Sequence, residues 1–205
     1  DGRQDIVAGS GDGHVWVSFR EAHGYAAPKM VTAAGGQLLR IGPEDMADTY
    51  AWPRICDING DGSADILAGS ASGTIEIWLN QSGFRQVGSL RVGGARVDVS
   101  GISTVEPVDY DGDGDMDVFV GVSPLPDGNR RETRGPQFRL PAGGLMYFEN
   151  NVPKGGGLPV FTKGVRLLGF IGSTEEDARV HAGVLCPRTI EPLFLQGARW
   201  SFLVG

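Results

Sequence analysis

The chain has 205 residues, of which 33 are glycine and 40% are hydrophobic. Average usage would give only about 14 glycines in a chain of this length, so the excess favours many turns and short strands over long helices. The net charge of −7 argues against a general nucleic-acid binder, and no apolar run approaches the roughly 18 residues of a membrane-spanning helix.

The chain contains an internal repeat. Its three clear copies are DGRQDIVAGSGDGHVWVSF (1–19), DGSADILAGSASGTIEIWL (61–79) and DGDGDMDVFVGV (111–122), the last resuming as GGLMYFEN (143–150). A degenerate fourth copy, TIEPLFLQGARWSFLVG, ends the chain at residues 189–205. Repeats about 50 to 60 residues apart are typical of stacked or radial structural units. We therefore expect one domain over residues 1–205, with units at about 1–49, 50–101, 102–188 and a partial unit at 189–205.

Each unit is predicted to be built from β-strands. Ile75, Ile77 and Leu79 alternate with Thr74, Glu76 and Trp78, which is the period of a strand. Four antiparallel strands in about 50 to 60 residues is the size of a propeller blade. The predicted fold is an all-β segment of a β-propeller with four-stranded antiparallel blades and hairpin loops, two of which are the acidic turns described next. The expected strands are Arg54–Cys56, Asp65–Gly69, Thr74–Leu79 and a weaker one near Phe84–Leu90, then Glu106–Val108 and Asp117–Gly121. One short helix is expected at Ser173–Arg179, where Ser173 would cap an acidic first turn.

Two acidic turns carry the chemistry of the sequence. Loop A (residues 57–65) and loop B (residues 109–117) both place oxygen side chains at positions 1, 3, 5 and 9 and glycine at position 6. Ca²⁺ takes six to eight oxygen ligands, and the glycine permits the sharp bend that turns alternate residues inward. Position 7 would contribute its backbone carbonyl and position 9 would close the site. The expected ligands are Asp57, Asn59, Asp61, Ser63 and Asp65 in loop A, and Asp109, Asp111, Asp113, Asp115 and Asp117 in loop B.

Two other readings of these turns are weaker. A metal-free Asp/Gly turn would leave five aspartates in nine residues repelling one another in loop B. An EF-hand needs a glutamate at position 12 and flanking helices, whereas position 12 here is Ala68 or Val120 within a β-type run. We predict two Ca²⁺ sites. A partial third at Asp1 and Asp5 lacks its upstream ligands.

The loops and the strands after them resemble the FG-GAP repeat of integrin α-subunit propellers and of bacterial VCBS-type proteins. DINGDGSADILAGS and DYDGDGDMDVFVG carry the resemblance, and FENN followed by GGGLPVFTKGVRL is similar to the bacterial branch. The resemblance implies Ca²⁺ between strands 1 and 2 of a blade. It also implies an extracellular, secreted or cell-surface location and roles in adhesion or glycan binding.

An insertion at residues 123–143 separates strands 2 and 3 of the third unit. It carries four arginines and four prolines in an otherwise acidic chain. The plain interpretation is a solvated loop, but connections longer than about 12–15 residues are often functional. In integrin-like propellers, loops between strands 2 and 3 lie on the ligand-binding face. Arg130, Arg131 and Arg134 are therefore candidate residues for binding carboxylate or sulfate groups.

The sequence favours binding over catalysis. No nucleophile elbow, phosphate loop or Cys/His zinc pattern is present. The expected function is an extracellular, Ca²⁺-stabilised adhesion or recognition module for a glycan or protein ligand. The alternatives are the propeller of a carbohydrate-active enzyme such as a polysaccharide lyase, and a structural segment of a surface assembly. Cys56 and Cys186 are too few for a disulfide scaffold, and whether they pair stays open.

The sequence begins and ends at different points within the repeat unit. The sequence opens within one acidic turn and stops at the matching strand three units later. The first blade should therefore lack an inner strand, and the last its outer two. Because propellers close with about four to eight blades, we expect further blades or partner chains to complete the ring.

Overall fold

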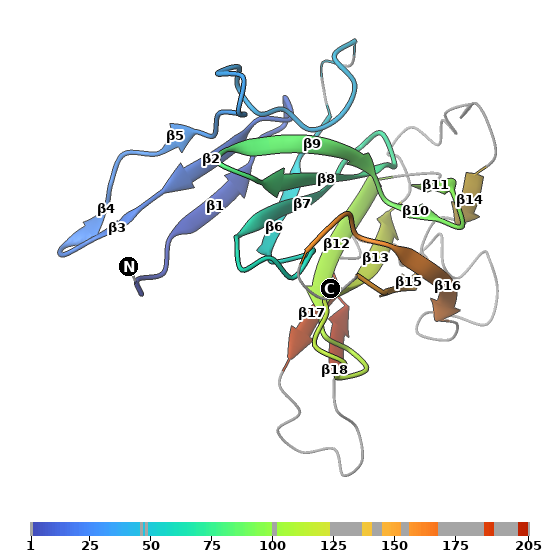
Figure 1. Cartoon of the computed structure of the whole chain (residues 1–205). Helices are drawn as coiled ribbons and strands as arrows, with labels where there is room; N and C mark the ends of the chain where they lie inside the picture. The colour runs from blue at the N-terminus through green and yellow to red at the C-terminus, as the bar shows by residue number, and fades with distance from the viewer. Residues whose placement is uncertain are drawn as a thin grey trace.

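A computed structural model describes residues 2–45, 47, 49–99, 102–123, 137–140, 145–152, 156–167, 187–190 and 201–204. These residues form eighteen strands and no helix, which confirms the all-β prediction (Figure 1). Accordingly, the described part of the chain holds no helix that could span a membrane. The helix predicted at Ser173–Arg179 lies outside the described residues.

The second repeat unit forms a complete four-stranded antiparallel sheet in the order β6-β7-β8-β9. Strand β7 has the predicted bounds, and β6 begins two residues earlier than expected because Trp52 pairs with Gly69 and Pro53 with Ala68. The strands are β6 (Trp52–Cys56), β7 (Asp65–Gly69), β8 (Ile75–Asn80) and β9 (Phe84–Ser89).

The third unit repeats this plan and extends it. Strands β12, β13, β15 and β16 are antiparallel, and the sheet continues from β16 through β10 and β11 to β14. Strand β14 falls inside the insertion, for which the sequence predicts no strand, and it runs parallel to β11. The bounds are β10 (Arg91–Val92), β11 (Ala95–Val99), β12 (Ile102–Val108), β13 (Asp117–Ser123), β14 (Gln137–Leu140), β15 (Leu145–Asn150) and β16 (Phe161–Leu167).

The two ends of the chain form smaller sheets. Among the described residues β1 pairs only with β2, which in turn pairs with β5, and β3 and β4 form a hairpin. A second hairpin, β17–β18, lies against β12 and β13. The bounds are β1 (Ile6–Gly9), β2 (Val15–Ser18), β3 (Arg20–Glu21), β4 (Gly24–Tyr25), β5 (Lys29–Met30), β17 (Pro187–Ile190) and β18 (Ser201–Val204).

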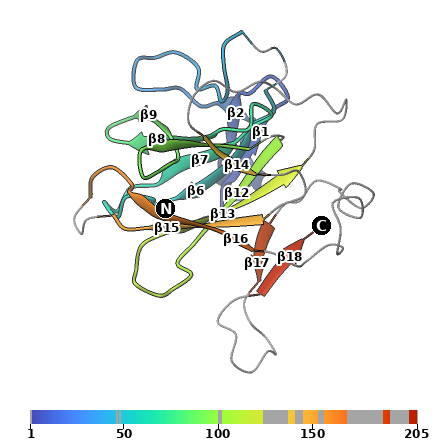
Figure 2. The same ribbon diagram turned by 90° about the vertical axis from the view of Figure 1, so that its right-hand side faces the viewer.

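The three main sheets pack face to face, as blades of a propeller do (Figures 1 and 2). Successive residues of β7 point to opposite faces of its sheet. Ile66 and Ala68 therefore pack toward the β1-β2-β5 sheet, while Leu67 packs toward the sheet of the third unit, which contains β12 and β13. All three are buried. Strand β7 is therefore apolar on both sides, and the arrangement is compatible with the predicted propeller segment.

Hydrogen bonds repeat at each junction between sheets. The amide of Ala51 donates to the carbonyl of Ser10 at 3.1 Å, and the amide of Ser103 donates to the carbonyl of Ser70 at 2.9 Å. The neighbouring inner strands β6 and β12 are also joined by an ion pair, Arg54 Nε to Glu106 Oε2 at 2.8 Å. The same contacts therefore set the spacing of successive units.

Candidate metal centre

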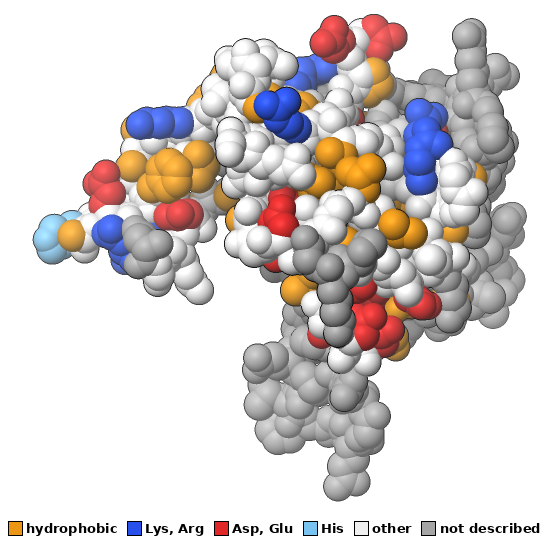
Figure 3. Space-filling model, in the orientation of Figure 1, with side chains coloured by type: hydrophobic (Ala, Val, Ile, Leu, Met, Phe, Trp, Pro, Cys, Tyr) orange, Lys and Arg blue, Asp and Glu red, His pale blue; other side chains and the backbone are white. Residues whose placement is uncertain are grey.

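Loops A and B occupy equivalent places in two adjacent sheets. Loop A joins β6 to β7 and loop B joins β12 to β13, so both are loops between strands, as predicted. They are neighbours, because the side-chain amide of Asn150 donates to the carbonyl of Ile58 at 3.0 Å and to that of Met116 at 3.1 Å. Figure 3 shows acidic side chains gathered low in the view, where Figure 1 places the β12–β13 loop.

Loop A is held by hydrogen bonds from its own backbone. The carboxylate of Asp57 accepts from the amides of Asp61 at 3.0 Å and Gly62 at 2.8 Å, and Gly62 has a φ of 85°. This left-handed conformation favours glycine, which accounts for its place in the motif. Asp61 in turn accepts from the amide of the half-buried Ser63 at 2.8 Å.

Asn59 stabilises the ionised carboxylate of Asp61 in loop A. It is buried, and its Nδ2 donates to Asp61 Oδ2 at 3.0 Å. That hydrogen bond, followed by one from the Ser63 amide, lowers the pKa of the exposed Asp61 carboxyl. The three carboxylates Asp57, Asp61 and Asp65 do not form a close group like the one found in loop B.

Loop B gathers carboxylates more tightly. One oxygen each of Asp109, Asp111 and Asp113 lie within 4.8 Å of one another, and this is the one such group of metal-ligating side chains among the described residues. Amides of the loop hold these side chains: Gly112 donates to Asp109 Oδ1 at 2.8 Å, and Asp113 donates to Asp111 Oδ1 at 3.2 Å. Positions 1, 3 and 5 thus turn their oxygens toward one point, as the alternation predicts.

Asp115 falls outside this group of three. Its Oδ2 accepts from the amide of Val152 at 3.2 Å, and its Oδ1 is buried with no hydrogen-bond partner in the described structure. Burial, and then the neighbouring charge of Asp113, raises the pKa of the Asp115 carboxyl to about 6. The ionised form of Asp115 is therefore disfavoured, and a nearby positive charge would stabilise it.

The aspartates at position 9 anchor the loops to the sheets. Asp65 accepts from the amides of Ile58 at 3.2 Å and Asn80 at 2.8 Å. Asp117 accepts from the equivalent amides of Tyr110 at 3.2 Å and Asn150 at 2.9 Å. Both carboxyls are buried, which is the main reason that their pKa values are raised.

Sequence reasoning missed Tyr147 and Asn150. The Tyr147 hydroxyl donates to Asp117 Oδ2 at 3.0 Å, and burial raises its pKa. The repeated asparagine at the end of the third strand, Asn80 and Asn150, is the signal that could have shown that β8 and β15 reach the loops.

The remaining predicted site residues lie elsewhere. Asp5 is exposed, and its Oδ1 accepts from the amide of Arg20 at 2.8 Å. This matches the anchoring bonds of Asp65 and Asp117. Asp1 and the three candidate ligand-binding residues of the insertion, Arg130, Arg131 and Arg134, lie outside the described residues.

The donor set of loop B fits a hard divalent cation. It offers three converging carboxylates, and beside them the Asp115 carboxylate has a buried oxygen with no hydrogen-bond partner among the described residues. Ca²⁺ prefers oxygen ligands of this kind, and its charge would relieve their mutual repulsion. Loop A has the same residue pattern, but among the described residues its carboxylates do not converge in this way.

Comparison with known proteins identifies the region that carries both loops. Residues 57–120 match the family model of the FG-GAP-like repeat. The match starts at the first residue of loop A and ends within β13, after loop B. Neither a curated protein nor a solved structure matches the chain significantly.

Proposed function

Because this chain carries an FG-GAP-like repeat across both acidic loops, we propose that it is an extracellular, Ca²⁺-stabilised recognition module without catalytic activity. The observation that carries the proposal is the convergence of Asp109, Asp111 and Asp113 within 4.8 Å. Extracellular modules bind Ca²⁺ at about 10⁻⁴–10⁻³ M, which suits sites on exposed loops.

In this proposal each loop holds one Ca²⁺. Asp109, Asp111 and Asp113 provide the carboxylates of loop B, Asp115 its backbone carbonyl, and Asp117 closes the site from the start of β13. Loop A uses the matching positions, Asp57, Asn59, Asp61, Ser63 and Asp65. When bound, the cation supplies positive charge that neutralises the carboxylates and fixes the loop between its strands.

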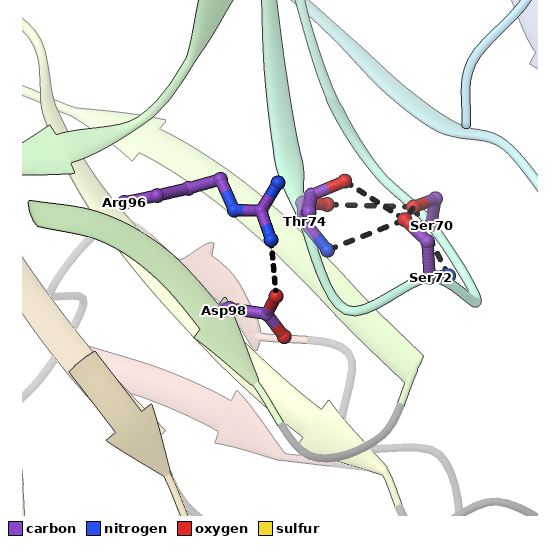
Figure 4. A network of polar contacts seen from close by, with 5 residues as sticks. All are labelled: Ser70, Ser72, Thr74, Arg96 and Asp98. Carbon is purple, nitrogen blue, oxygen red and sulfur yellow. Dashed lines mark hydrogen bonds and ion pairs between the residues drawn. The ribbon is translucent and has the colours of Figure 1, made fainter. Parts of the chain in front are cut away.

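The end of the sheets opposite the acidic loops is the proposed ligand-binding face. The insertion leaves β13 there, and β14 returns to pair with β11. Figure 4 shows polar groups of this region, in which the buried Asp98 pairs with Arg96 at 3.0 Å and Ser72 Oγ lies 2.8 Å from Thr74 Oγ1. The arginines of the insertion favour an acidic glycan or protein ligand at this end.

Calcium titration of the purified chain tests the metal part of the proposal. Calorimetry should give two sites, and Asp111→Asn should abolish the site in loop B while Glu21→Gln, which removes an exposed charge in β3, should leave both. No heat of binding up to about 10 mM Ca²⁺, ten times the weaker end of the extracellular range, would overturn it. A screen with acidic polysaccharides for unsaturated products distinguishes recognition from lyase activity.

A further inference from the structure

A buried residue at the end of β15, Asn150, contacts both acidic loops. Its side chain is 1% exposed and lies between loop A and loop B. Nδ2 donates to the Ile58 carbonyl in loop A and to the Met116 carbonyl in loop B, at 3.0 and 3.1 Å. Both donor hydrogens of the amide are therefore used, one for each loop.

The other polar groups of Asn150 bond to the chain that follows it and to Asp117 at the start of β13. Oδ1 accepts from the amides of Asn151 at 3.1 Å and Val160 at 3.2 Å, and the Asn150 amide donates to Asp117 at 2.9 Å. A buried amide with all its bonds made is rigid, because loss of any partner would leave a polar group unsatisfied.

The connector after β15 (residues 151–152 and 156–160) contacts both loops as well. Val152 donates to Asp115 Oδ2 in loop B at 3.2 Å, and the Gly157 carbonyl accepts from Asn59 Nδ2 in loop A at 3.3 Å. Gly156 lies so close to Asp61 that a Cβ there would be 3.2 Å from the Asp61 Cβ. A second set of contacts, independent of the Asn150 side chain, thus spans the loops.

Asn80 occupies the same place in the second unit and, within the part of the chain that the structure describes, makes no such bridge. Its amide donates to Asp65 at 2.8 Å, as that of Asn150 does to Asp117, but its Oδ1 accepts from Gly83 within its own β8–β9 turn. The β15–β16 pairing is irregular between Glu149 and Asn150, whereas that of β8–β9 is irregular earlier, between Ile77 and Trp78. Such irregularities re-aim side chains, which accounts for the different use of the two asparagines.

We propose that Asn150 is a positioning residue for both loops, so that ordering one loop orders the other and Ca²⁺ binds the two with positive cooperativity. The cooperativity rests on the proposed function, because it requires Ca²⁺ binding. The linkage of loop A to loop B through Asn150, called the junction below, does not depend on metal. Energetic coupling between linked sites is typically about 5–150-fold in affinity, and the connector adds a second link between the loops beside Asn150.

Hydrogen exchange in excess EDTA tests the junction without metal. Asn150→Ala should raise exchange at loop A amides such as Ile58 and Gly62 and also at loop B amides such as Tyr110 and Gly112. The matched control, Asn80→Ala, should raise exchange only in the β8–β9 turn. Unchanged loop A rates in Asn150→Ala would overturn the proposal. If that variant does not fold, Asp113→Asn replaces it: loosening of loop A by this change in loop B supports the junction, and an unaffected loop A refutes it.

Calcium titration tests the cooperativity. Asp113→Asn should weaken binding to loop A by about 5-fold or more. A double-mutant cycle should show that this effect is reduced in the Asn150→Ala background, where the connector still links the loops. Equal loop A affinities in wild type and Asp113→Asn would overturn the cooperativity. Absence of Ca²⁺ binding at both loops would refute the proposed function and the cooperativity together, and hydrogen exchange would still decide the junction.

Discussion

Gly69, the last residue of β7, lies directly against the carbonyl group of Ser103 near the start of β12. A Cβ at position 69 would be 2.2 Å from that oxygen, and at the equivalent junction a Cβ at Gly9 would be 2.0 Å from the carbonyl oxygen of Ala51. Real contacts of this kind do not fall below about 3 Å. Glycine recurs at the end of the second strand because the next unit's backbone occupies the space of a side chain.

We therefore predict that Gly69→Ala lowers the free energy of unfolding by about 1–3 kcal/mol, the range for forced overpacking. The neighbouring atoms are backbone and cannot rotate away. Gly11→Ala is the control, since its Cβ would meet nothing closer than the Tyr50 ring at 3.6 Å, and it should change stability by less than about 0.5 kcal/mol. Urea unfolding measures both variants, and equal stability of the two would contradict the packing argument.

Glu76 in β8 gives a prediction about pH. It is buried, and its carboxylate accepts from the Gly42 amide at 2.7 Å, Gln86 Nε2 at 2.8 Å and Trp78 Nε1 at 3.2 Å. Burial raises its pKa above 4.5 although these donors and Arg40 oppose the shift. The folded state therefore holds this proton more tightly than the unfolded chain. The stability that Glu76 contributes is complete below pH 4.5 and is lost as the pH rises through its folded pKa.

Glu76→Gln isolates this contribution, because glutamine does not titrate and all other carboxyls remain. The amide nitrogen would face the Trp78 and Gln86 donors or the Gly42 donor, so the variant should lose about 1–3 kcal/mol at pH 5. The loss should be smaller at pH 7. Urea unfolding of both proteins at the two pH values checks this. A stability loss that is larger at pH 7 than at pH 5 would contradict the predicted direction.

Local sequence patterns predicted the acidic hairpins. The pairing of β14 and the burial of Glu76 depend instead on contacts between segments that are distant in the sequence, which such patterns do not reveal. The bounds of β7 follow from an apolar run between Asp65 and Gly69, and both ends are set by local chemistry. The pairing of β14 with β11 joins segments about 40 residues apart, and no periodicity in the insertion indicates it. The alternation around Glu76 predicted a strand but not that the polar face would also be buried, because only the neighbouring sheet covers it.

The arginines of the insertion give a prediction about recognition. Replacing Arg130, Arg131 and Arg134 together by Ser should weaken binding to dextran sulfate while stability changes by less than about 0.5 kcal/mol, as for surface positions. The control replaces three exposed basic residues elsewhere, Lys29, Arg85 and Arg91, and removes the same charge. Surface plasmon resonance at fixed salt compares the two triple variants. Equal weakening would mean that net charge, not the insertion, governs binding, and a stability loss of several kcal/mol would mean that the insertion is structural.

Calcium should stabilise the fold through both acidic loops. At roughly 1 mM Ca²⁺ and a dissociation constant near 10⁻⁴ M, each site adds about 1.4 kcal/mol by linkage. Excess EDTA should therefore lower the melting temperature. Asp113→Ala should remove one ion and at least half of the effect, because loss of that ion also weakens binding at the other loop. Asp61→Ala is the matching change in loop A. Its effect should be the smaller, because Asp61 already accepts from Asn59, whereas loop B gathers three carboxylates and leaves a buried oxygen of Asp115 unpartnered in the described structure. Elemental analysis counts the ions, and a melting temperature unmoved by EDTA in a protein without bound metal would refute the calcium sites.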